Sequence, residues 1–299
     1  MRTIILPREV TIDSIRRNII EFRDYVDRSS DGAALSIDLT KVEFIKPAGV
    51  IALNNIFQWS KQDKGIEVSF IVNTETKNKR NREVMEYLSD CGFFANFGQE
   101  DIFKVPRLRS TMLSLKTVET SKVNQWKQSD LMGWLQRQTG KRNDFSSICV
   151  AIDEIFNNIS DHSTEKIGSI FGQYYPKKNE IIIAVSDFGI GIPTSLKEKC
   201  DEEKTDNGWI EEALKEGVST QSVPQNRGAG LANIMKTLTT NKIGQVTIIS
   251  NCGKVKLENN QIVESRTFTE SYQGTFFELK IDTSNQSLYD LEEEEDFEW

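Results

Sequence analysis

Cysteine is scarce in this chain of 299 residues, and its four cysteines stand far apart. No two of them form the Cys-x-x-Cys spacing that is common in zinc sites and redox pairs. Isolated thiols argue against a disulfide framework and fit the reducing conditions of the cytoplasm. The four residues are Cys91, Cys149, Cys200 and Cys252.

Long apolar runs are also absent. One of the longest, residues 180–185 (EIIIAV), is far shorter than the roughly 20 residues that a membrane-spanning helix needs. Residues 1–10 lack the apolar core and the small-residue cleavage site of a signal peptide. With 37% hydrophobic and 27% charged residues, the composition predicts a cytoplasmic globular protein that has no membrane partner and is long enough for two domains.

The chain has no excess of basic residues. Its formal net charge is −8, but residues 290–299 hold seven of the 45 acidic residues and no basic one. The rest of the chain therefore has 37 basic and 38 acidic residues, which argues against a dedicated nucleic-acid surface. We expect the acidic run to stay solvated. Phe297 and Trp299 leave open that it docks on a basic partner.

The first 110 residues alternate between strand-like and helix-like patterns. Within residues 11–27, Ile12, Ile15 and Ile19 recur at the spacing of one helix face. Such alternation predicts an α/β layer. The other expected helices are 48–65, which Gly65 closes, and 81–94, and the expected strands are 3–7, 33–45 and 66–73.

Residues 35–56 (LSIDLTKVEFIKPAGVIALNNI) resemble the STAS domain, the fold of anti-anti-sigma factors. That family has Asp-Ser-Ser-Gly at the start of a helix, and one of these serines is its phosphorylation site. Here the matching stretch is Lys46-Pro47-Ala48-Gly49, so the acceptor hydroxyl is missing. The resemblance therefore implies a STAS-like scaffold that is not itself switched by phosphorylation.

Residues 144–163 (DFSSICVAIDEIFNNISDHS) are predicted to form a helix with two different faces, with Asp144 as its N-cap. Glu154, Asn158 and Asp161 are spaced by four and three, so they share one face. On composition alone, a solvated polar face is the simplest interpretation. The isoleucines recur at spacings of four, three and four, which predicts a buried stripe of Ile148, Ile152, Ile155 and Ile159.

The motifs that follow favour a more specific interpretation. Residues 185–193 (VSDFGIGIP) contain the Asp-Phe-Gly of protein kinases, but serine follows the only histidine, His162, so there is no His-Arg-Asp loop. Two more motifs come later, NRGAGLANIMKTL at 226–238 and GTFFELKI at 274–281. Together with the helix at 144–163, and in this order, they resemble the GHKL superfamily of gyrase B, histidine kinases, MutL and the ATP-driven heat-shock chaperone.

This resemblance covers roughly residues 112–283. It implies the Bergerat fold, an α/β sandwich in which helices cover one face of a mixed sheet. The expected fold class is therefore α/β throughout. The expected domains are a STAS-like domain at 1–110, an ATP-binding domain at 111–285 and an acidic tail at 286–299, with the seam within 98–111.

The resemblance also implies how a nucleotide base would be recognised. Asp187 matches the aspartate that accepts a hydrogen bond from the adenine amino group. Gly189 and Gly191 would leave space for the base and the ribose, since a Cβ there would collide with them. Thr275 matches the threonine that supports the aspartate.

Further residues match the part of the family's site that holds the phosphates. Gly228 and Gly230 begin a helix whose free N–H groups suit phosphate oxygens. Asn158 matches the asparagine that ligates Mg²⁺ through its amide oxygen. Glu154 matches the catalytic glutamate that activates the attacking water, and Asp161 matches an acid on the adenine side.

The implied function is that of an ATPase in which binding and hydrolysis of Mg-ATP change the contact with an unidentified protein partner or a second copy of the chain. Glu154, Asn158 and His162, each four apart, also resemble anti-sigma-factor kinases, which leaves open a serine/threonine kinase with the same pocket. A nucleotide-gated binding module without turnover is the third possibility. His162 would lie either beside the phosphates or simply at a helix end.

Overall fold

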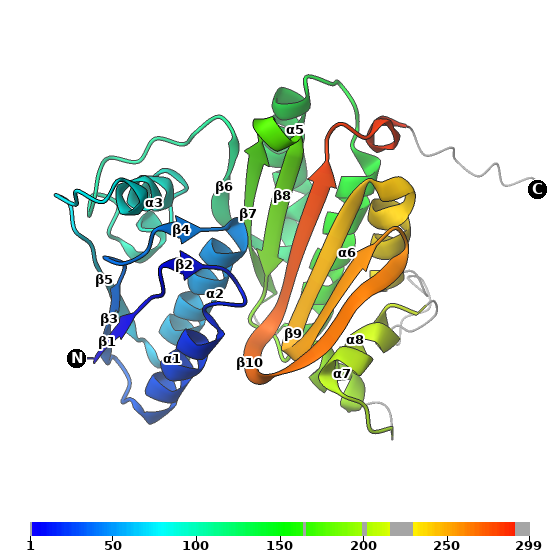
Figure 1. Ribbon diagram of the computed structural model, residues 1–299. Coiled ribbons are helices and arrows are strands. Elements are labelled where there is room, and N and C mark those ends of the chain that lie inside the picture. Colours follow the sequence, from blue (N-terminus) through cyan, green and yellow to red (C-terminus); the bar gives the residue numbers. More distant parts are fainter. Residues whose placement is uncertain (1, 164–165, 199–201, 216–229, 291–299) are drawn as a thin grey trace, which may run out of the picture.

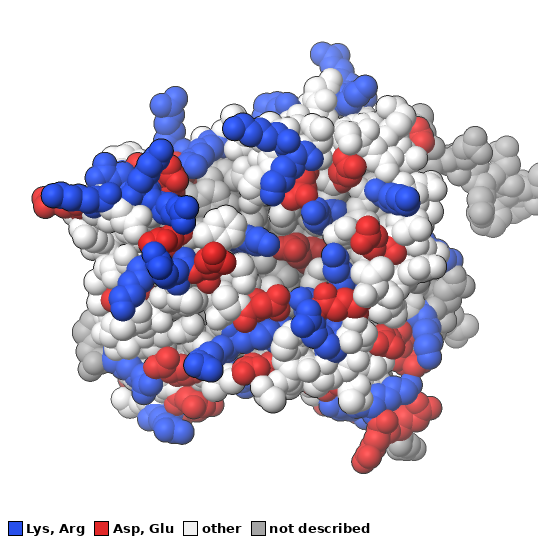
Figure 2. Space-filling model, in the orientation of Figure 1, with Lys and Arg blue, Asp and Glu red and all other residues white. Residues whose placement is uncertain are grey.

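The computed structural model describes residues 2–163, 166–198, 202–215 and 230–290 (Figure 1). Gly228 and the acidic run 291–299 lie outside the described residues. Among the helices that are described, none is both long and apolar enough to cross a bilayer. On the face drawn in Figure 2, basic and acidic side chains are interspersed.

The N-terminal part, residues 2–110, is an α/β layer, as the alternating pattern predicts. Its main sheet is parallel and has the strand order β1-β3-β5. The strands of this sheet are β1 (Arg2–Ile5), β3 (Ala34–Asp38) and β5 (Glu67–Ile71), and β2 (Glu9–Val10) pairs with β4 (Phe44–Ile45). The helices are α1 (Arg16–Arg28), α2 (Pro47–Lys64) and α3 (Lys79–Asp90).

Local signals explain most of these boundaries. Helix α2 has Pro47 in its first turn and ends at Gly65, whose φ of 61° is left-handed. The side chain of Asn78 caps α3. Helix α1 begins at Arg16 and not near residue 11, because Thr11 and Ser14 bond to each other: the Thr11 N–H donates to Ser14 Oγ at 2.8 Å. Such local bonds compete with the helix.

The C-terminal part, residues 111–290, is built on a five-stranded sheet of order β6-β7-β8-β10-β9. Every neighbouring pair in it is antiparallel, so the expectation of a mixed sheet is wrong for this chain. Hairpins join β7 to β8 and β9 to β10, and the helical connection from β6 to β7 also returns antiparallel. The strands are β6 (Met112–Glu119), β7 (Ile167–Tyr175), β8 (Glu180–Ser186), β9 (Gly244–Glu258) and β10 (Gln261–Asp282).

Helix α6 (Ser146–His162) covers one face of this sheet, and its predicted isoleucine stripe is confirmed, because all four side chains are fully buried there. The prediction of its N-cap is wrong. Phe145 occupies that position with a left-handed φ of 50°, and Asp144 instead accepts the Ser146 N–H through Oδ1 at 3.2 Å. The other helices of this part are α4 (Val123–Trp126), α5 (Met132–Thr139), α7 (Ile192–Lys197), α8 (Asp206–Ala213) and α9 (Gly230–Ile234).

Helix α2 of the N-terminal part covers the opposite face of the sheet (Figure 1). The helices described within residues 111–290 all pack in one core with α6, so this part's own helices cover a single face, as expected. Residues 47–57 of α2 are all buried, and they share one apolar core with Phe171 and Phe276 of the sheet. A helix that is apolar on all sides must be enclosed on all sides, and α2 lies between two sheets. The division of the chain near residue 110 stays a prediction.

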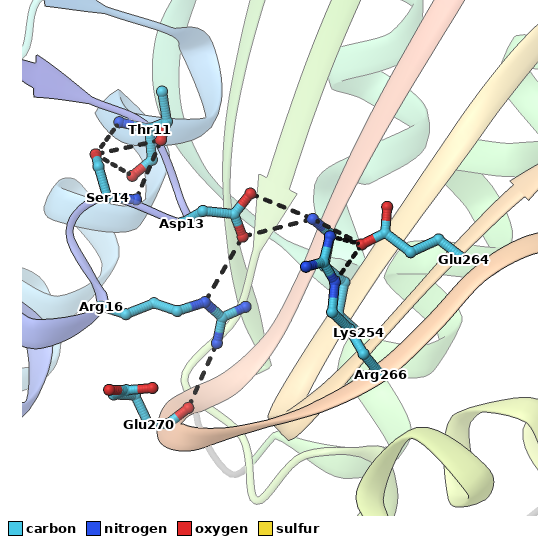
Figure 3. A network of polar contacts seen from close by, with 8 residues as sticks. All are labelled: Thr11, Asp13, Ser14, Arg16, Lys254, Glu264, Arg266 and Glu270. Carbon is cyan, nitrogen blue, oxygen red and sulfur yellow. Dashed lines mark hydrogen bonds and ion pairs between the residues drawn. The ribbon is translucent and has the colours of Figure 1, made fainter.

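A polar network makes a second contact between the two parts (Figure 3). The guanidinium of Arg16 is 6% exposed, lies 3.5 Å from the ring centroid of Phe268 and donates to the carbonyl of Glu270 at 3.4 Å. Asp13 lies 3.7 Å from Arg16 and 3.2 Å from Lys254 in β9. The start of helix α1 is thereby joined to the middle of the β9–β10 hairpin.

We predict that Arg16→Ala lowers the free energy of unfolding by about 2 kcal/mol, because a desolvated cation–π contact and the packing of a long side chain are both lost. The control is Arg17→Ala at the adjacent, exposed position, which should stay within about 0.5 kcal/mol of the wild type. Urea denaturation measures both values. Equal stability of the two variants would show that the network does not hold the two parts together.

Candidate functional site

Asp187 lies directly after β8 and is buried, with 5% of its surface exposed. Its backbone N–H donates to the carbonyl of Thr275 at 3.0 Å, which continues the ladder between β8 and β10. Its carboxylate Oδ1 accepts the N–H of Gly189 at 2.5 Å. The structure therefore brings together three residues that the sequence analysis selected separately.

Gly274 lies so close to Asp187 that no other residue fits. A Cβ at this position would be 2.3 Å from the Asp187 carbonyl oxygen and 2.8 Å from Oδ1. Its φ of +80° also favours glycine. The resemblance pointed to Thr275 of the Gly-Thr pair and not to Gly274, although a glycine inside a strand pattern is itself a signal of close backbone approach.

Ser250 of β9 connects the elements around Asp187, and no sequence motif indicates it. Its Oγ lies 3.1 Å from Thr275 Oγ1, donates to the carbonyl of Gly274 at 3.1 Å and accepts the N–H of Ile192 at 2.9 Å. One hydroxyl thus connects β9, β10 and the start of α7. Thr275 is buried and is part of this group.

Gly191 is required by the fold itself. Its φ is +85°, and a Cβ would lie 2.3 Å from Asn251 Oδ1 and 2.8 Å from Ser250 Oγ. The sequence analysis attributed this glycine to the space that a base needs, whereas the atoms that exclude a side chain here belong to β9. The neighbouring Ile190 is 45% exposed, which leaves an apolar side chain open to solvent beside a buried carboxyl group.

Burial raises the pKa of Asp187 to about 7, and backbone hydrogen bonds from Gly189 and Thr275 oppose this rise. None of the ion pairs within the described ranges includes Asp187, so no cation compensates for its desolvation. A buried carboxyl group with a raised pKa and no charged partner is a frequent feature of functional sites.

The predicted polar residues of helix α6 belong to a second group of site residues, separate from those around Asp187. Glu154 and Asn158 are half-buried and Asp161 is exposed. Glu154 Oε1 accepts a hydrogen bond from Asn233 Nδ2 at 2.9 Å. Asn233 belongs to α9, whose first residue is Gly230, so Glu154 is not merely solvated. The sequence analysis missed Asn233, because nothing in the local pattern of α9 shows which of its residues faces α6.

The site residues therefore form two groups. The first group contains Asp187, Gly189, Gly191 and Thr275, and the second contains Glu154, Asn158, Asp161 and Gly230. No hydrogen bond between described residues joins the groups. Both include residues next to the same apolar core between the sheet and α6.

Oxygen donors dominate the second group. Among the described residues, no three His, Cys, Asp or Glu side chains are placed to hold a metal ion by themselves. A half-buried asparagine one turn from a glutamate fits a hard cation such as Mg²⁺ that takes its remaining ligands from water and phosphate. Asn158 therefore fits the predicted role.

No protein-family model matches the chain, and no curated protein matches it either. The interpretation of the site consequently rests on the geometry above and on the order of the motifs.

We predict that Asp187→Asn stabilises the unliganded protein, and increasingly so as the pH rises. Below about pH 4 the carboxyl group is protonated in both states, whereas between pH 4 and 7 the unfolded chain releases the proton that the folded chain keeps. Stability of the wild type thus falls through this window, by an amount on the order of 3 kcal/mol, and stays low above it. Denaturation curves at pH 4.5 and pH 8 measure the change.

Asp282→Asn, at the exposed opposite end of β10, is the control for this effect. Its stability relative to the wild type should not grow with pH. A pH-independent difference for Asp187→Asn as well would mean that Asp187 is ionised in the folded protein throughout this range.

Proposed function

We propose that the chain binds ATP beside Asp187 and hydrolyses it with Glu154. The observation that carries this proposal is the buried carboxyl group of Asp187, which has no cationic partner among the described residues and is positioned by close backbone contacts from β10. A hydrogen-bond acceptor of this kind suits a neutral donor such as the amino group of adenine. The order of the four motifs supports the same conclusion.

The first group of residues would recognise the base. An amino donor next to Asp187 stabilises its ionised form, which burial disfavours in the unliganded protein. Ile190 would provide an apolar surface for the base. Thr275 and Ser250 would keep the aspartate in place, since their hydroxyls connect β10, which pairs with β8, to β9.

Three members of the second group, Glu154, Asn158 and Gly230, would act on the phosphates, whereas Asp161 would lie toward the adenine. The backbone N–H groups at the start of α9 would bind phosphate oxygens. Asn158 would hold Mg²⁺, which neutralises phosphate charge when bound. Glu154 would orient the attacking water and accept its proton. The amide of Asn233 would fix the orientation of Glu154, since it occupies Oε1 and leaves Oε2 for the water.

We predict that Asp187→Asn abolishes ATP binding in isothermal titration calorimetry. In one orientation the new amide would present its NH₂ donor to the adenine amino group. In the other it would present an oxygen that lacks the negative charge of the carboxylate. Asp282→Asn is again the control and should bind ATP as the wild type does. An Asp187→Asn protein with unchanged affinity would place the base elsewhere.

We predict that Glu154→Gln keeps ATP affinity but lowers turnover at least ~10²-fold, the usual contribution of a positioned base. The control is Asp153→Asn, since Asp153 is the adjacent acid on α6 and pairs with Lys127 instead. Phosphate release is measured in both variants. Normal turnover in Glu154→Gln would exclude the hydrolytic role of Glu154, and phosphate appearing on a protein instead of in solution would indicate a kinase.

A further inference from the structure

Helix α2 of the N-terminal part reaches the candidate base site through one side chain. Asn55 is 1% exposed, and its Nδ2 donates to the carbonyl oxygen of Asp187 at 2.7 Å. The same nitrogen lies 3.3 Å from the hydroxyl of Tyr272 in β10. A residue 132 positions earlier in the chain thereby holds the peptide of the aspartate.

The hydrogen bonds around Asp187 hold its backbone from two directions. Thr275 accepts the N–H of Asp187 within the sheet, and Asn55 donates to its carbonyl from α2. The preceding residue is held as well, because Ser186 Oγ lies 2.8 Å from Tyr272 Oη and donates to the Thr275 carbonyl at 2.9 Å. These bonds fix the backbone from which the side chain extends, and the N–H of Gly189 then holds Oδ1 of the carboxyl group.

The Asn55 side chain is an unfavourable choice for packing alone. Its Oδ1 is buried and has no hydrogen-bond partner in the structure as described. An unpaired buried oxygen destabilises a fold, and an apolar side chain of similar shape would avoid this loss. The hydrogen bond to Asp187 is the feature that an apolar residue could not supply, which points to a role in the site.

The preceding residue provides an internal comparison. Asn54 is equally buried, but its Nδ2 donates to Ser169 Oγ in β7 at 3.0 Å, and its Oδ1 accepts from Asn96 at 2.9 Å. Asn54 thus connects the same helix to the same sheet, and these two hydrogen bonds do not involve the candidate site. Variants of the two asparagines can therefore distinguish two roles: Asn54 attaches α2 to the sheet, whereas Asn55 also holds the backbone of Asp187.

We infer that Asn55 is a positioning residue through which the N-terminal part sets the adenine specificity of the site. This inference rests on the proposed function. Without the hydrogen bond from α2, the segment that begins at Asp187 gains freedom, and its carboxylate no longer meets the amino group of the base at a fixed angle. Contacts to the phosphates are unaffected, because they belong to α6 and α9.

The test compares Asn55→Leu with Asn54→Leu by calorimetry with ATP, ADP and inosine triphosphate, which has a carbonyl oxygen in place of the adenine amino group. We expect Asn55→Leu to weaken ATP and ADP binding alike, by about tenfold, as the loss of one buried hydrogen bond suggests. The preference for ATP over inosine triphosphate should shrink with it. Asn54→Leu should change each affinity less than about threefold and keep the preference, as expected of a contact that only attaches α2.

An unchanged preference for ATP in a folded Asn55→Leu protein overturns the inference. Tyr272→Phe, which keeps the ring and removes only the hydroxyl between Asn55 and Ser186, is the milder second variant. It should lower the same preference by a smaller factor, and it keeps the inference testable if Asn55→Leu does not fold.

Hydrogen exchange without nucleotide separates this inference from the proposed function. Asn55→Leu should speed exchange of the amides in residues 187–191, and Asn54→Leu should not. If the wild type binds none of the three nucleotides, the proposed function fails while exchange still decides the role of Asn55. Equal exchange in the two variants overturns that role in either case.

Discussion

The enclosure of helix α2 between two sheets is the constraint on which the rest of the structure depends. Twelve of its eighteen residues are buried, and they contact the parallel sheet on one side and the antiparallel sheet on the other. Burial of apolar surface is the dominant favourable term in folding, so the two parts of the chain stabilise each other through this helix. Two polar side chains of this helix, Asn54 and Asn55, are buried in the same apolar interface, where the low dielectric strengthens their hydrogen bonds.

In the candidate site, the register of the sheet positions the carboxyl group of Asp187, whose burial is unfavourable in the unliganded protein. The pairing of β8 with β10 places Gly274 and Thr275 beside Asp187, and the pairing of β10 with β9 brings Ser250 to the same point. Burial then raises the pKa of the carboxyl group, which lowers the stability of the unliganded protein at neutral pH. Such a loss is typical of functional sites, because a group that is poorly satisfied alone is well placed to bind a ligand.

Local patterns predicted what depends on neighbours in sequence. The isoleucine stripe of α6 and the glycine at the end of α2 could both be read from the local sequence. The direction of β6 relative to β7, and the cover that α2 gives to the sheet, depend on pairing and packing between distant segments, so the expected mixed sheet was wrong and the cover by α2 was not foreseen. The same limit applies to the site. Ser250, Asn233 and Asn55 acquire their roles from residues at least 24 positions away in the chain.

The two groups of site residues depend on different parts of the fold. The first group lies between β8, β9, β10 and α2, and the hydrogen bond of Asn55 connects it to the N-terminal part. The second group lies on α6 and α9, on the face of the sheet that α2 does not touch. In the proposed function, a signal that shifts α2 would therefore act on how tightly the nucleotide is held, through Asp187, and would leave Glu154 and its water in place. The N-terminal part would thus control occupancy of the site and not the chemical step, because the hydrogen bond from Asn55 ends on the backbone of Asp187.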